Sequence, residues 1–90
     1  MINACVIGLS TIGLLHCRNL IKIKKTQLTY VFDYNSKLRN KISKKFKCKT
    51  SNNFENILKD KSIKLFIIAS PTNTHEHYVR KLISHNKMIY

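Results

Sequence analysis

The sequence predicts an α/β fold of three layers, in which a parallel sheet is covered by helices on both faces. Short apolar segments alternate with longer segments of helical periodicity along the 90 residues. The only two glycines follow the first apolar segment, and the only proline follows the last long one. Strands that alternate with helices pair in parallel through right-handed crossovers, which place helices on both faces. A chain of this length is expected to form one small domain.

The first strand and the first helix are predicted from an apolar run and a helical stripe. Ile2–Ile7 is apolar and ends at Gly8, as a buried parallel strand would. A helix is indicated over roughly Thr11–Ile23, and the lysine pair after it suits the carboxyl end of a helix. The stripe that predicts this helix consists of Ile12, Leu15, Leu20 and Ile23.

The next elements are a strand, a capped helix and a short edge segment. Leu28–Phe32 is rich in β-branched and aromatic residues, which predicts a second strand that stops at Asp33. Asn35 or Ser36 can cap the helix that follows. A brief third strand is expected over Cys48–Thr50. The second helix is indicated by apolar residues at every fourth position, namely Leu38, Ile42 and Phe46.

The second half of the chain continues the alternation. Asn52 or Asn53 can cap a short helix, and Ile63–Ala69 is the most apolar candidate strand. Ser70–Asn73 breaks that strand, because Pro71 disfavours helical backbone at Ser70. Met88–Tyr90 resembles the opening of a last strand. The short helix would bury Phe54, Ile57 and Leu58; the last helix, capped by Thr74, would bury Val79, Leu82 and Ile83.

The net charge of +13 allows two interpretations. A basic surface could bind the phosphates of nucleic acid. Alternatively, the lysines reflect composition, because Lys, Asn and Ile make up 35 of the 90 residues and have codons rich in A and T. Only three residues are Arg, the side chain that reads bases and grips phosphates with a bidentate fork. We therefore do not expect nucleic acid as the main partner, although charge alone does not decide.

The cysteines, the histidines and the hydropathy narrow the class of protein further. Cys5, Cys17 and Cys48 are odd in number and far apart, which argues against a disulfide framework and a zinc ribbon. His75 and His77 would point about 200° apart on a helix, so no metal site is expected. We recognise neither a signal peptide nor a run of 18 uncharged apolar residues, and expect a cytoplasmic chain without a membrane partner.

Residues Gly8–Gly13 form the first candidate site. They match the dinucleotide-binding pattern G-x-G-x-x-G except that Ser10 stands in place of the middle glycine. In this pattern the first glycine permits a tight turn and the third lets the helix lie close to the strand, while amides at the helix start face a pyrophosphate. Ser10 adds a Cβ where the backbone must approach the phosphates, which weakens the expected affinity. A purely structural role for the two glycines remains the alternative.

Asp33 strengthens the cofactor interpretation. It lies at the end of the second predicted strand, 20 residues after Gly13, where a carboxylate is expected to bind the adenosine ribose. The alternative is an aspartate that opens a turn before Asn35. A carboxylate here would repel the 2′-phosphate of NADP, so NAD is favoured, although Lys37 and Arg39 lie near enough to soften the preference.

The segment Ala69–His75 carries a resemblance to a known family. A strand followed by Pro-x-x-x-His, after a glycine-rich first turn and an acidic second strand, is similar to the N-terminal NAD(P)-binding Rossmann domain of the Gfo/Idh/MocA oxidoreductases, which include inositol 2-dehydrogenases. The resemblance covers essentially the whole chain. It implies a Rossmann-type fold, nicotinamide dinucleotide binding and an oxidoreductase origin.

The resemblance also implies roles for individual residues. Asp33 would bind the ribose, and His75 matches the family's histidine in its loop, with capping or packing of the last helix as the alternative. The pyrophosphate would be lined by Gly8, Ser10, Thr11, Ile12 and Gly13. The nicotinamide-side ribose and phosphates would contact Ser70, Pro71, Thr72 and Asn73.

Family members continue beyond the last strand with a Glu-Lys-Pro motif, whose lysine helps catalysis, and then with a substrate domain. Residues 1–90 stop where that motif would begin, so we expect an incomplete dinucleotide-binding domain that has no catalytic residue and no turnover of its own. A sugar or polyol substrate is implied only for a full-length enzyme. The alternative function is a degenerate pseudo-enzyme module for interaction. The exposed edge of the last strand suggests self-association.

Overall fold

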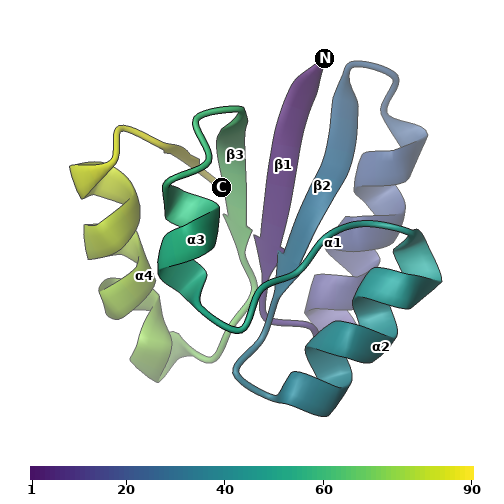
Figure 1. The fold of residues 1–90 in the computed structure, drawn as a ribbon, viewed down its shortest axis with the longest axis horizontal. Coiled ribbons are helices and arrows are strands. Elements are labelled where there is room, and N and C mark those ends of the chain that lie inside the picture. The colour runs from purple at the N-terminus through teal and green to yellow at the C-terminus, as the bar shows by residue number, and fades with distance from the viewer.

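A computed structural model describes all residues 1–90 and shows a parallel sheet between two helical layers (Figure 1). Four strands, in the order β2-β1-β3-β4 and all paired in parallel, form the sheet. The strands are β1 (Ile2–Ile7), β2 (Thr26–Phe32), β3 (Ile63–Ile68) and β4 (Met88–Ile89). The helices are α1 (Thr11–Lys22), α2 (Ser36–Phe46), α3 (Phe54–Leu58) and α4 (Thr72–Ser84). The predicted α/β fold is confirmed.

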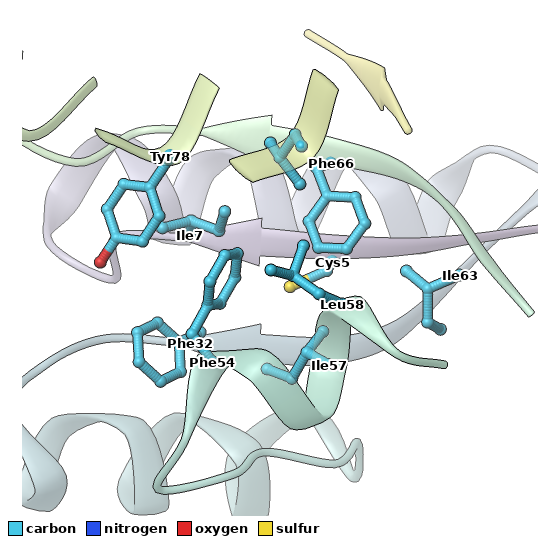
Figure 2. Packing of buried hydrophobic residues seen from close by; sticks show 10 residues of the cluster. Cys5, Ile7, Phe32, Phe54, Ile57, Leu58, Ile63, Phe66 and Tyr78 are labelled. Carbon is cyan, nitrogen blue, oxygen red and sulfur yellow. The ribbon is translucent and has the colours of Figure 1, made fainter. Parts of the chain in front are cut away.

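The two faces of the sheet bury separate clusters of side chains. In Figure 1, α1 and α2 lie on one side of the strands and α3 and α4 on the other. Alternate residues of the central strand β1 serve the two clusters: Ala4 and Val6 pack toward α1 and α2, and Cys5 and Ile7 toward α3 and α4. Figure 2 shows the second cluster, in which four of the ten buried residues are aromatic. Burying each large apolar side chain stabilises the fold by roughly 1.5–3 kcal/mol.

The residues that cap α2 and α3 are among those predicted. The side chain of Asn35 accepts a hydrogen bond from the Leu38 N–H at 3.1 Å, so Asn35 rather than Ser36 caps α2. Asn53 rather than Asn52 caps α3, accepting from the Glu55 N–H at 3.0 Å. Such caps satisfy amide groups that would otherwise lack partners at the helix start.

The buried face of α1 differs from the predicted stripe. Gly13, Cys17 and Leu20 are its buried residues, whereas Ile12, Leu15 and Ile23 are exposed. Only Leu20 of the predicted stripe is correct. The reason is steric: the side of the helix with Gly13 is the one that can approach the sheet closely, and it sets the rotation of the whole helix.

The start of α4 was also predicted incorrectly. The helix begins at Thr72 with Pro71 as its N-cap, three residues before the expected cap, Thr74. The fixed backbone of proline suits a helix start, and the Pro71 carbonyl accepts from the Thr74 N–H at 2.9 Å. Of the residues predicted to be buried, Leu82 is buried, Val79 is half-buried and Ile83 is exposed, while Tyr78 is buried in addition.

The expected third strand over Cys48–Thr50 is reduced to one bridge. Lys49 pairs in parallel with Tyr30, and its N–H and C=O bond to Thr29 and Val31 on β2. The neighbours of Cys48, Lys47 and Lys49, are both exposed, so the segment has little apolar surface to hold it along the edge of the sheet. At the other edge, Tyr90 extends the short β4 through backbone bonds to Phe66 and Ile68.

No helix in the structure has the length and apolarity needed to cross a membrane.

Candidate functional site

The loop between β1 and α1 lies against the loop that follows β3. Gly8 has a φ of +90°, and a Cβ there would lie 2.5 Å from the Ser70 nitrogen. Only glycine combines this positive φ with so close an approach of two backbones. The two loops therefore meet at the carboxyl ends of β1 and β3, which is where ligands bind in open parallel sheets.

The second glycine of the motif packs the helix onto the loop. A Cβ on Gly13 would overlap the Gly8 carbonyl oxygen and lie 2.7 Å from the Gly8 carbonyl carbon. The structural role that the sequence left open for these glycines is therefore real. It does not exclude a binding role, because the packing fixes where the amides at the start of α1 point.

The N–H groups of the first turn of α1 are available to a ligand. The first backbone hydrogen bond of the helix runs from the Leu14 N–H to the Ser10 carbonyl at 2.9 Å. Ser10 is the N-cap but its side chain forms no cap, and the first turn contains no acidic residue. Unpaired amides and the helix dipole together favour an anion at this position.

Asp33 joins two loops through its carboxylate. Its Oδ2 accepts from the Leu9 N–H at 2.9 Å, and its Oδ1 accepts from the Asn35 N–H at 2.9 Å. The side chain therefore opens a turn, as one alternative held, and also lies beside the glycine-containing loop, as the other required. An ionised carboxylate has about four lone-pair sites, so two acceptor positions remain for a ligand.

The guanidinium group of Arg39 is bonded to backbone carbonyl groups. Its Nη1 donates to the carbonyl oxygens of Asp33 and Tyr34, each at 3.3 Å. The guanidinium thus fixes the turn after β2. Lys37, the other basic residue predicted near this site, is exposed.

The segment after β3 is ordered by its own hydrogen bonds. The Thr74 hydroxyl bonds to the Ser70 hydroxyl at 2.9 Å and donates to the Pro71 carbonyl at 2.8 Å. His75 Nε2 donates to the Ser70 carbonyl at 2.5 Å. His75 therefore stabilises the segment before α4, and it also lines a hollow.

Two hollows adjoin one another at this edge of the sheet, and Ser70 and Pro71 line both. One has a volume of about 270 Å³ and is lined by Gly8, Asp33, Tyr34, Ser70, Pro71, Asn73, Thr74 and Tyr78. The other, of about 370 Å³, is lined by Ser10, Ile12, Ile68, Ala69, Ser70, Pro71, Thr72 and His75. Nine of the eleven predicted site residues line this crevice. The exceptions are Thr11, exposed at the helix start, and Gly13, buried behind Gly8.

Sequence reasoning missed three residues of the smaller hollow: Tyr34, Thr74 and Tyr78. Tyr34 could have been found, because it directly follows the candidate ribose ligand. Tyr78 could not, because its position depends on how α4 packs. Burial, with a further contribution from Tyr34, raises the pKa of Tyr78 well above its usual value, so its hydroxyl stays neutral.

No three His, Cys, Asp or Glu side chains are grouped to hold a metal ion.

The fold and the geometry of the crevice define a dinucleotide-binding domain of the Rossmann class. The chain matches a family model described as the oxidoreductase family with an NAD-binding Rossmann fold over residues 2–90. It therefore belongs to the Gfo/Idh/MocA family of oxidoreductases, as the resemblance implied.

Solved structures of this class superpose on nearly the whole chain. GenD2 from gentamicin A biosynthesis, solved with NAD, is 19% identical over 98% of this chain, with a TM-score of 0.93. A putative myo-inositol dehydrogenase from Sinorhizobium meliloti 1021 is 20% identical over 99% of it, with a TM-score of 0.92. A probable dehydrogenase from Thermotoga maritima is 25% identical over 98%, also with a TM-score of 0.92. The chain spans 25%, 27% and 27% of these proteins, respectively. No curated protein sequence matches it.

Proposed function

We propose that residues 1–90 bind a nicotinamide dinucleotide in the crevice at the carboxyl ends of the strands. The observation that carries the proposal is the hydrogen bond from the Leu9 N–H to Asp33 Oδ2, which places a carboxylate beside the unpaired amides of α1. In this arrangement Asp33 binds the adenosine ribose, the pyrophosphate lies over Gly8, Ser10, Thr11 and Ile12, and Gly13 supports this loop from behind Gly8. Ser70, Pro71, Thr72 and Asn73 line the nicotinamide-side ribose and phosphates, and His75 holds their loop.

The residues present fit such a ligand. Gly8 leaves a space that a Cβ would fill, and the first turn of α1 has donors without partners. Ser10 is the one departure from the binding pattern. Its side chain is exposed and forms no cap, so its hydroxyl is free to donate to a phosphate oxygen, but its Cβ restricts the approach. We therefore expect weak binding.

We propose further that NAD is preferred to NADP. The carboxylate of Asp33 would repel a 2′-phosphate on the ribose that it binds. Arg39 compensates only in part, because its Nη1 is already bonded to two carbonyl oxygens. The exposed Lys37 is the other cation near enough to attract that phosphate.

In an enzyme of this family, we propose that these residues hold the cofactor while residues outside 1–90 bind a sugar or polyol and complete catalysis. Bound nicotinamide supplies hydride transfer. We assign no catalytic residue within 1–90 and expect no turnover from them alone. The three free thiols suit a reducing compartment, and we propose a cytoplasmic location on that ground.

Calorimetry tests the proposal directly. The 90-residue chain is titrated with NADH and NADPH while circular dichroism confirms that it is folded. We expect saturable binding of NADH in the millimolar range or tighter and weaker binding of NADPH. A folded sample that releases no heat at millimolar NADH would overturn the assignment.

A further inference from the structure

Tyr34 is an exposed aromatic side chain that the fold does not explain. Tyr34 directly follows Asp33 in the sequence. The residue is 66% exposed, although its ring has a large apolar surface. It lines the smaller hollow together with Asp33 and Tyr78. An exposed aromatic at the rim of a cavity is available to a ligand that has a flat apolar face.

The surroundings of the Tyr34 ring restrict its orientation. Its centroid lies 5.8 Å from that of Phe32, with an angle of 71° between the rings. The centroid of the Tyr78 ring lies 6.0 Å from that of Tyr34. The Tyr34 carbonyl accepts from Arg39, which anchors the backbone. A ring held in this way stacks on a ligand with little further loss of side-chain entropy.

The chemistry of the hollow suits a neutral heterocycle. Asp33 is the only residue with a charged side chain among those that line it. A base is bonded directly to its ribose, so a ribose held by Asp33 carries its base to the residues adjoining Asp33. Tyr34 is the aromatic residue at that place.

We propose that Tyr34 is the platform on which the purine base of the dinucleotide stacks. The proposal rests on the proposed function and adds a residue that determines affinity for the adenosine half. Because stacking uses the π face rather than the hydrogen-bonding edge of the base, adenine and hypoxanthine dinucleotides gain equally from Tyr34.

Substitutions at Tyr34 separate stacking from packing. Tyr34→Phe keeps the ring, whereas Tyr34→Leu keeps an apolar contact with Phe32 but has no π face. Because both variants lose the stacking of the base on an aromatic ring, Tyr34→Leu and Tyr34→Ala are expected to weaken NADH and ADP-ribose binding by about tenfold. Tyr34→Phe keeps the aromatic ring, so its affinity for both ligands should stay within about twofold of the wild type. Binding of nicotinamide mononucleotide is unchanged in all three.

Tyr90→Ala is the matched control, because Tyr90 is 78% exposed and lies outside the crevice. It should bind NADH as the wild type does. The proposal is overturned when Tyr34→Leu binds as tightly as Tyr34→Phe, or when Tyr90→Ala weakens binding as much as Tyr34→Ala. A wild-type chain that binds no NADH refutes the proposed function together with this inference, whereas a wild type that binds and a Tyr34→Leu variant that is unaffected refute only the inference.

Tyrosine fluorescence gives a second readout. The chain has no tryptophan and four tyrosines, so its intrinsic fluorescence reports on tyrosine. Saturating ADP is expected to quench part of this emission in the wild type. In Tyr34→Phe most of the quenching disappears although binding persists. Equal fractional quenching in the two proteins would show that the base does not lie on Tyr34.

Discussion

Gly13 packs so closely against Gly8 that any side chain at position 13 would overlap the Gly8 carbonyl group. The contact joins the start of α1 to the end of β1, and both elements also form the proposed pyrophosphate site. The same two residues therefore control the stability of the domain and the direction of its free amides.

Gly13→Ala is expected to destabilise the domain by at least about 3 kcal/mol, because backbone must move to admit the methyl group. Urea denaturation followed by circular dichroism measures the change. Asn19→Ala, at an exposed position of the same helix, is the control and should be neutral or slightly stabilising, since alanine has the higher helix propensity. Equal midpoints for Gly13→Ala and the wild type would contradict the steric argument.

Asp33→Asn should lower both stability and cofactor affinity. The amide oxygen of asparagine cannot replace both carboxylate oxygens, so one of the Leu9 and Asn35 N–H groups loses its acceptor. We expect a loss of about 1–2 kcal/mol in the free energy of unfolding and a further loss of NADH affinity measured on the folded protein.

Asp60→Asn is the matched control for this substitution. Asp60 also accepts from a backbone amide and a second donor, the N–H and hydroxyl of Ser62, but it lies outside the crevice. Both Ser62 groups donate to Oδ1, an acceptor that asparagine keeps, so Asp60→Asn should reduce stability less than Asp33→Asn does and should leave NADH binding unchanged. If both variants lose binding equally, Asp33 acts only through stability and is not a ligand.

The adjacency of Asp33 and the Gly8 loop could be predicted from sequence because it follows from topology. Two parallel neighbouring strands end at the same edge, so residues just past Ile7 and Phe32 must lie close together. The positions of the glycines and of Asp33 at the ends of two predicted strands are therefore enough to predict that they lie close together. Side-chain packing need not be known.

Other features depend on packing and could not be predicted. The rotation of α1 follows from the approach of Gly13, a residue that hydrophobic periodicity ignores, so Ile12 and Leu15 were wrongly placed inside. Tyr78 enters the hollow because the face of α4 that packs on the sheet contains Tyr78 and Leu82 rather than Val79 and Ile83. Small errors in the predicted helix phase thus changed which residues were expected to be buried, whereas the predicted parallel pairing of the strands is correct.

Stability should fall in acid partly through Glu55. The Lys81 ammonium donates to the Glu55 carboxylate and lowers the pKa of Glu55 below its ordinary value of 4.5. A group whose pKa is lowered by folding contributes stability that is fully present above its unfolded pKa and is lost as pH falls through the folded pKa. Urea midpoints should therefore decrease below about pH 4.5, as this linkage requires.

The variant Glu55→Gln is expected to lose stability at pH 7 and to show a flatter decline between pH 5 and pH 3, since one linked proton is removed. The effect is small, because both side chains of this ion pair are about one-third exposed or more. Parallel pH profiles for the two proteins would show that the pair makes no contribution.

Removing the charge of Asp33 should also change the choice of cofactor. We expect the wild type to prefer NADH to NADPH by about tenfold or more, because the carboxylate repels a 2′-phosphate. Asp33→Ser removes that repulsion and leaves Lys37 exposed nearby. The ratio of the two dissociation constants, measured by calorimetry, should approach one or reverse. An unchanged ratio would mean that other residues select the cofactor.

Self-association of the isolated chain is expected through β4. This edge strand is only two residues long, and the side chains of Met88 and Ile89 are 53% and 37% exposed. Unpaired strand edges promote pairing between copies, but the charge of +13 opposes it. Raising the salt concentration screens that repulsion, so light scattering should show association that increases with protein concentration and with salt.

Ile89→Lys places a charge on the edge and should restore the monomer, whereas Ile83→Lys, exposed on α4, should not. A monomer at all salt concentrations, or equal effects of the two substitutions, would rule out the edge as the contact.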